Sequence, residues 1–257
     1  SNFGKDFEFS KVHSLEEYRE KVPIQNYEDF RPFVERILEG EKDVLFSESV
    51  TGFVETSGTS AKAKLIPVTK SWSEHVQTAQ ILWVISLLRD RPGIEMGQTL
   101  RLLSSATERK TSLGLPIGAN TGRMQDALPK WMQGKSIFPT ELDEIKEQEL
   151  KVYLHLRFAL QVPITSWTTA NPSTILLYCR KLKEHRDFLA QDLAQGTAEC
   201  GPASFLSSEF RAKIEPYLQK CSAPIDWRPA SIWPLKAVNC WKGGPANFFV
   251  EQLPKAL

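Results

Sequence analysis

The sequence predicts an α/β fold in which mixed sheets are covered by helices. Short runs of β-prone residues alternate along the chain with longer segments whose apolar residues recur at spacings of three and four. The clearest strand signals are Gly52–Glu55 and Leu65–Val68, which flank a loop of hydroxyl, glycine and lysine residues. With 257 residues, the chain is long enough to bury a substantial core.

Three helices are predicted in the first ninety residues. Ser14 and Glu17 have the spacing of a capping box before the first helix. Asn26 caps the second helix, and Gly40 is its stop signal. The third helix covers about 71–89, where a long apolar periodicity follows the second strand.

The rest of the chain continues the alternation of strands and helices. Leu113–Gly122 is the exception, because it is too rich in glycine for regular structure and is expected to be a loop. The predicted elements are, in order, strand Thr99–Ser104, helix Glu141–Gln161, strand Ile164–Thr168, a helix capped by Asn171, helix Ser207–Lys220, strand Leu235–Cys240 and helix Ala246–Leu253.

Composition excludes several function classes. The 32 basic and 31 acidic side chains give a net charge of +1, so no bulk field favours nucleic acid or an anionic membrane. No window reaches the ~18 uninterrupted apolar residues of a membrane span. The four cysteines form no C-x-x-C pair and the four histidines are scattered, so no metal site is predicted on side chains. We expect a reducing, cytoplasmic setting without disulfides.

The loop between the first two strands has the chemistry of an anion site. Gly58 allows close approach of a ligand to the backbone, and amide groups in such a turn form a concave nest for anions. Hydroxyl donors and lysine charges suit phosphate oxygens. An ordinary polar hairpin loop is the alternative, and the spacing is not that of a Walker loop. The candidate phosphate-binding residues are Thr56, Ser57, Gly58, Thr59, Ser60 and Lys64.

Three motifs carry a resemblance to a known family. The run Thr56–Ser60 with its trailing lysines resembles the phosphate loop of the adenylate-forming superfamily, which includes acyl-CoA ligases and firefly luciferase. The continuation Lys64–Pro67 and the upstream segment Val22–Glu41 are similar to the Gretchen Hagen family, the auxin-responsive acyl acid amido synthetases of plants and their bacterial relatives. Agreement at six places in the same order covers about 6–250. Ala61 departs from the motif, which usually has glycine there.

This resemblance implies the N-terminal, ATP- and acyl-binding domain of an enzyme that activates a carboxylic acid as its adenylate and transfers it to an amino acid or another amine. The phosphate loop would hold ATP with Mg²⁺ and would supply no catalytic nucleophile or base. Trp83 and Thr121 correspond to the wall of the acyl pocket. The family's adenosine contacts and C-terminal lid lie beyond Leu257, so residues 1–257 alone are expected to be an inactive part of that enzyme.

Two other functions are compatible with these motifs. An enzyme resembling acyl-CoA ligases would use the same adenylation with a thiol acceptor, and a pantetheine tunnel would distinguish it. A non-catalytic binding module of the same fold would have lost the use of ATP, and Ala61 is the residue that raises this possibility. Titration with nucleotide separates the second alternative from both enzymes.

Overall fold

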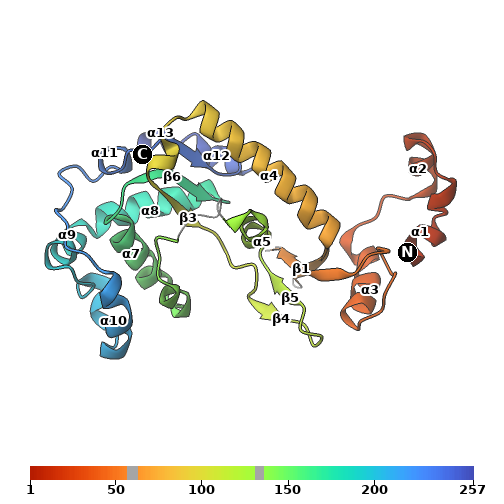
Figure 1. Cartoon of the computed structure of the whole chain (residues 1–257), viewed down its shortest axis with the longest axis horizontal. Coiled ribbons are helices and arrows are strands. Elements are labelled where there is room, and N and C mark those ends of the chain that lie inside the picture. Colours follow the sequence, from red (N-terminus) through yellow and green to blue (C-terminus); the bar gives the residue numbers. More distant parts are fainter. Residues whose placement is uncertain (57–62, 131–135) are drawn as a thin grey trace. The chain divides into compact units, whose positions relative to one another are not determined.

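The computed structural model describes residues 1–56, 63–130 and 136–257, and its elements are labelled in Figure 1. The chain divides into two compact units. The first comprises Ser1–Val84 and continues from Ser104, and the second comprises Ile85–Leu103 and the C-terminal part up to Leu257. Each unit has its own sheet, so the predicted mixed α/β class is confirmed.

The sheet of the first unit has the strand order β2-β1-β5-β4. β1 (Val50–Thr56) and β2 (Lys64–Thr69) are antiparallel neighbours, as the sequence predicts on either side of the polar loop. β5 (Pro116–Gly118) runs parallel to β1 and antiparallel to β4 (Arg109–Lys110). The buried core beneath this sheet consists of Val34, Ile37, Val44, Phe53 and Ile117.

The predicted caps at the start of the chain are present. Ser14 Oγ accepts a hydrogen bond from the Glu17 amide at 3.1 Å, and Asn26 forms a capping box with Asp29. α4 has no fully buried residue along its whole length. The helices that include residues of this unit are α1 (Asn2–Asp6), the 3₁₀ turn η1 (Phe9–Lys11), α2 (Leu15–Lys21), α3 (Tyr27–Leu38), α4 (Lys70–Asp90) and α5 (Asn120–Ala127).

The second unit is built on a parallel sheet with the order β3-β6-β7. Its strands are β3 (Gln98–Leu102), β6 (Ile164–Thr169) and β7 (Ala237–Asn239). Trp167 of β6 is fully buried, and its ring meets those of Tyr178 and Trp233 edge to face. The helices are α7 (Gln148–Ala159), α8 (Pro172–Glu184), α9 (Arg186–Gln195), α10 (Ser208–Ile214), α11 (Pro229–Ile232), α12 (Ala246–Val250) and α13 (Leu253–Ala256), with 3₁₀ turns η2 (Ile94–Met96), η3 (Thr140–Glu144), η4 (Gly201–Phe205) and η5 (Glu215–Tyr217).

Three predicted helices are shorter than expected. The helix predicted over 141–161 is split into η3 and α7, because the Glu147 side chain accepts from the amides of Glu149 and Leu150 and starts a new helix. The helix predicted over 207–220 ends as an α-helix at Ile214, two residues before Pro216. The predicted C-terminal helix is divided between α12 and α13.

A buried polar network ties α7 to α9. The Tyr153 hydroxyl donates to Asp192 Oδ2 at 2.6 Å, and burial is the main cause that raises the pKa of Tyr153. Arg157 has no exposed surface and donates to the backbone carbonyls of Asp192, Thr197 and Gln219. A buried charge with this many acceptors is compensated, so the network stabilises the unit.

All four cysteines are free thiols, as predicted. Among the described residues, no helix has an apolar stretch long enough to cross a bilayer.

Candidate functional site

The candidate site lies at one edge of the first sheet. β1 and β5 are parallel, with Phe53 opposite Ile117 and Val54 opposite Gly118, so their carboxyl ends share an edge. β1 leads at this edge into residues 57–62, and β5 leads into α5 (Figure 1). The carboxyl ends of parallel strands are the usual ligand-binding edge of α/β sheets.

Two candidate residues are placed at this edge. Thr56 is the last residue of β1, and Thr121 is the second residue of α5. Ser57, Gly58, Thr59 and Ser60 lie outside the described residues, so their contacts with phosphate stay a prediction. Asn120, which begins α5, has a buried Oδ1 without a hydrogen-bond partner. A buried acceptor in this position suits a donor group of a ligand.

Lys64 is held opposite Thr56 by the antiparallel ladder of β1 and β2. Its ammonium lies 5.7 Å from the centre of the Tyr27 ring, a cation–π geometry. The Tyr27 hydroxyl also donates to the Leu65 carbonyl at 2.9 Å and accepts from the Leu65 amide at 2.7 Å. β2 is an edge strand of the described sheet, so this hydroxyl occupies backbone groups that no other described strand pairs.

The two hydrogen bonds between the Tyr27 hydroxyl and Leu65, which we call the Tyr27 clamp, were not predicted from the sequence. On physical grounds the segment that contains Tyr27 predicts only an amphipathic helix, although its sequence resembles that of the family. The structure shows that Tyr27, the first residue of α3 after the Asn26 cap, fixes β2 beside Lys64. An aromatic residue at the start of a helix was the only sequence feature that pointed to this contact, and such residues occur for many other structural reasons.

Arg123 is a second residue that the sequence did not single out. Its guanidinium, carried by α5, donates to the carbonyl of Pro116 at 2.8 Å and to that of Phe53 at 3.4 Å. It thus bridges both parallel strands below the candidate edge. Burial lowers the pKa of Arg123, and its Nε is buried without a partner. A β-carbon at Gly52 would lie 2.2 Å from this guanidinium, so glycine makes room for it.

The segment 113–122, predicted to be an irregular loop, contains β5 and the start of α5 instead. The glycines predicted to break regular structure here serve close packing. A β-carbon at Gly118 would lie 2.5 Å from the carbonyl of Ala106, and one at Gly122 would lie 2.2 Å from the Ala106 amide nitrogen. These contacts give both glycines a structural role, while the role of Thr121 between them stays a prediction.

Trp83 lies on α4 with 47% of its surface exposed, so it is not a core residue. α4 lies beside α5, because Gln77 Nε2 donates to the Ala127 carbonyl at 2.6 Å. The predicted wall residues Trp83 and Thr121 thus come from neighbouring helices of one unit. Whether they line one acyl pocket stays a prediction.

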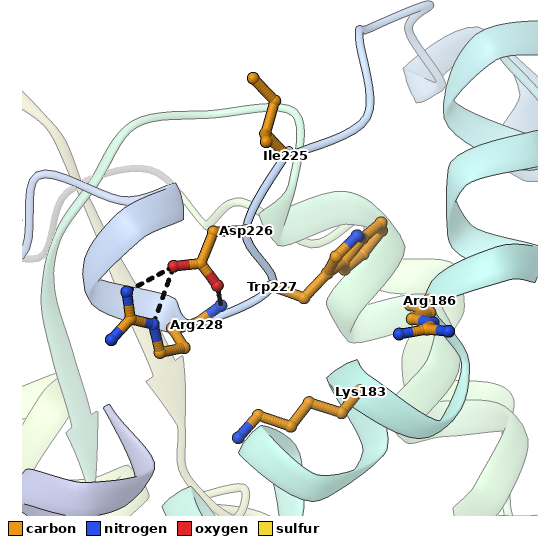
Figure 2. Close-up of a pocket in the computed structure, with 6 residues that line it drawn as sticks. All are labelled: Lys183, Arg186, Ile225, Asp226, Trp227 and Arg228. Atoms are coloured by element: carbon orange, nitrogen blue, oxygen red, sulfur yellow. Dashed lines mark hydrogen bonds and ion pairs between the residues drawn. The ribbon is translucent and has the colours of Figure 1, made fainter.

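A pocket of about 440 Å³ lies in the second unit, and no described candidate residue is among those that line it (Figure 2). Lys183 and Arg186 line one side, and Trp227 packs against the core. Asp226 accepts hydrogen bonds from Arg228 and Ser231, and its pKa is held at about 2, chiefly by Arg228. The pocket is lined by Lys183, Arg186, Ile225, Asp226, Trp227 and Arg228.

Among the described residues, one cluster has metal-ligating side chains, namely Glu149, Glu184 and His185. The Lys181 ammonium lies 2.7 Å from Glu149 Oε1 and 3.0 Å from Glu184 Oε1, so it supplies the positive charge that a metal ion would bring. His185 Nε2 is 2.8 Å from the same Glu149 oxygen. Lys181 is the largest cause of the lowered pKa of Glu149. We interpret this cluster as an ion-pair network.

The comparisons with known proteins agree with the motifs. The model of the GH3 family N-terminal domain matches residues 1–257. The chain belongs to the GH3 family. It is 34% identical over 118 residues to indole-3-acetic acid-amido synthetase GH3.2 of Arabidopsis thaliana, covering 45% of this chain and 22% of the relative. It is 32% identical over 106 residues to 4-substituted benzoates-glutamate ligase GH3.12 of the same plant, covering 40% and 18%.

The fold of this chain is similar to that of a solved GH3 structure. The solved structure of the GH3.15 acyl acid amido synthetase superposes with a TM-score of 0.68 at 17% identity, covering 96% of this chain and 45% of that one. The GH3 chain described here therefore spans less than half the length of the structure it matches, and its matches to the two curated relatives span about a fifth of theirs.

Proposed function

We propose that the complete protein containing this GH3 chain activates a carboxylic acid with ATP and joins it to an amino acid or another amine. In this proposal residues 1–257 form the ATP- and acyl-binding part. The observation that carries it is the shared carboxyl edge of β1 and β5, where β1 ends at Thr56, the first residue of the hydroxyl-rich segment, and β5 leads into α5. The relatives named as an amido synthetase and a glutamate ligase support the same reaction class.

Lys64 fits the role of a phosphate ligand. No described carboxylate forms an ion pair with its ammonium, which rests on the Tyr27 ring. Glu55 precedes Thr56 on β1, and its Oε1 forms an ion pair with the Arg109 guanidinium at 2.6 Å. This pairing reduces the repulsion between Glu55 and an incoming anion. Mg²⁺, bound through phosphate oxygens, would supply charge neutralisation of the departing pyrophosphate.

The remaining roles follow from position. Thr56, Ser57, Gly58, Thr59 and Ser60 would give hydroxyl and amide donors to the β- and γ-phosphates. These groups stabilise a leaving group and transfer no proton, so none of them acts as a base or a nucleophile. Trp83 and Thr121 would line the acyl pocket. The four free thiols support a reducing, cytoplasmic setting.

The test is product analysis on the complete protein. Indole-3-acetate and 4-substituted benzoates are incubated with ATP, Mg²⁺ and each amino acid, and products are identified by mass spectrometry. We expect an amide together with AMP. Lys64→Ala should lower the rate about 10- to 100-fold, as expected for losing a charge-assisted hydrogen bond. Lys70→Ala is the matched control, since Lys70 is exposed and pairs only weakly with Glu74.

Two other results would contradict this function. Thioester formation with coenzyme A but no amide would indicate an acyl-CoA ligase. Nucleotide binding without release of AMP from any acid would indicate a binding module.

A further inference from the structure

The parallel sheet of the second unit has one polar face. Arg101 of β3, Thr168 of β6 and Asn239 of β7 are in register and form a row across the three strands. The neighbouring row of Leu100, Trp167 and Val238 faces the hydrophobic core, so the polar row points to the opposite face. Besides Ala237, that face carries Thr99, Arg101, Ser166, Thr168 and Asn239.

The hydroxyl and amide groups of this face are partly paired with each other. Thr99 Oγ1 lies 2.7 Å from Ser166 Oγ, and Asn239 Nδ2 donates to Thr168 Oγ1 at 3.2 Å. The Thr168 hydroxyl accepts in that contact and keeps its own hydrogen to donate. Asn239 likewise keeps a second N–H. Both groups are therefore available donors in the same row as Arg101, Thr168 on the neighbouring strand and Asn239 on the strand after it.

Arg101 differs from the other arginines with low exposure. Within the described ranges its guanidinium has no hydrogen bond and no ion pair, whereas Arg157 donates to three carbonyls and Arg123 to two. Burial alone lowers the pKa of Arg101. No carboxylate is present among the residues of its face. A half-buried cation without a carboxylate partner on its face is a favourable place for an incoming anion.

The row also lies where ligands bind. Arg101 and Thr168 are each one residue before the carboxyl end of their strand, and Asn239 is the last residue of β7. The carboxyl edge of a parallel sheet is the usual ligand site. A planar guanidinium at the end of a row that carries two further donors can hold the two oxygens of a carboxylate.

We propose that Arg101, with Thr168 and Asn239, binds a carboxylate of a substrate that does not itself react. This inference rests on the proposed function, in which the reacting carboxylate must attack phosphorus. A carboxylate held by two N–H groups of an arginine is less nucleophilic, because the hydrogen bonds and the adjacent positive charge stabilise its negative charge. The bound group is therefore a second carboxylate of the acid or the α-carboxylate of the acceptor amino acid.

Paired substrates distinguish these two sources in the complete protein. Pyrophosphate exchange, which needs no acceptor, compares terephthalate with benzoate. Amide formation compares alanine with alaninamide. If the site holds a second carboxylate of the acid, Arg101→Leu should raise the KM of terephthalate about 10- to 100-fold and leave the KM of benzoate unchanged. If it holds the α-carboxylate of the acceptor, Arg101→Leu should raise the KM of alanine by the same factor and leave the KM of alaninamide unchanged. Arg101→Lys should recover part of the loss, and Arg180→Leu, at an exposed site of α8, is the charge-matched control.

The same variants separate binding from structure. Arg101→Leu removes an uncompensated cation, so its melting temperature should equal or exceed that of the wild type. A lower melting temperature, or equal losses with both members of each pair, would overturn the proposal, because Arg101 would then be paired within the protein.

A binding measurement keeps the proposal testable if the wild type activates no acid. Glutarate should raise the melting temperature of the wild type and Arg180→Leu, but not that of Arg101→Leu. The absence of a shift in the wild type would overturn the carboxylate site itself. Failure of the proposed function alone would instead appear as glutarate binding without any exchange.

Discussion

Removal of the Tyr27 hydroxyl tests how the lysine beside the candidate phosphate site is positioned. In Tyr27→Phe the ring remains under Lys64, while the hydrogen bonds to the Leu65 amide and carbonyl are lost. A typical hydrogen bond contributes about 1 kcal/mol, so two of them predict a loss of about 1–3 kcal/mol. The loss should be local, because both bonds end on one residue of an edge strand.

Hydrogen exchange measures this loss directly. We expect the Leu65 amide to exchange about 5- to 150-fold faster in Tyr27→Phe, on the scale of ~1.4 kcal/mol per tenfold. Urea denaturation should show a lower midpoint with an unchanged slope. Tyr18→Phe is the control, since Tyr18 is an exposed tyrosine of α2. Unchanged protection of Leu65 in Tyr27→Phe would refute the clamp and with it this explanation of the Lys64 position.

Three further predictions concern packing and charge. Burial lowers the pKa of His155 to about 3, so below pH 6.5 the unfolded chain binds more protons than the folded one. The free energy of unfolding should therefore be about 2 kcal/mol lower at pH 5 than at neutral pH. Urea denaturation of His155→Gln at several pH values should show a flatter pH dependence. Gly122→Ala should destabilise by about 1–3 kcal/mol in thermal unfolding, because its methyl group meets the Ala106 backbone. Arg157→Leu should cost about 3–5 kcal/mol in urea by breaking the network around Asp192, and a smaller loss than in an exposed control such as Arg180→Leu would contradict that network.

The strands on either side of the polar loop could be predicted because local signals there are unambiguous. Gly52–Glu55 alternates apolar and polar residues, and Pro67 prevents a long helix in the return strand. The caps at Ser14 and Asn26 are equally local, since each depends on side chains within three residues. Patterns of this kind need no knowledge of tertiary contacts.

The misprediction of segment 113–122 depends on contacts between separate segments, whereas the break before α7 depends on a local cap that the sequence analysis did not single out. Gly118 and Gly122 read as loop residues, yet they form part of β5 and α5 because the backbone near Ala106 approaches them. The break before α7 depends on the Glu147 side chain turning back to cap the next helix. Propensity alone does not separate these outcomes.

The candidate site was only partly predictable for the same reason. The sequence motif identified Thr56 and Lys64, which the ladder of β1 and β2 brings opposite each other. It gave no indication of Tyr27 or Arg123, whose partners lie 38 and up to 70 residues away. Such residues become visible only when the strands and helices that carry them are assembled.

The most direct test of the account is acid-dependent exchange of labelled pyrophosphate into ATP by the complete protein. In the proposed function, exchange requires both the candidate phosphate-binding loop and reversible formation of an acyl adenylate. The account predicts exchange that depends on a carboxylic acid, is reduced about 10- to 100-fold by Ser57→Ala or Lys64→Ala, and is unaffected by Lys70→Ala. Acid-dependent exchange at the wild-type rate in both Ser57→Ala and Lys64→Ala would contradict the assignment of this loop to the phosphates of ATP.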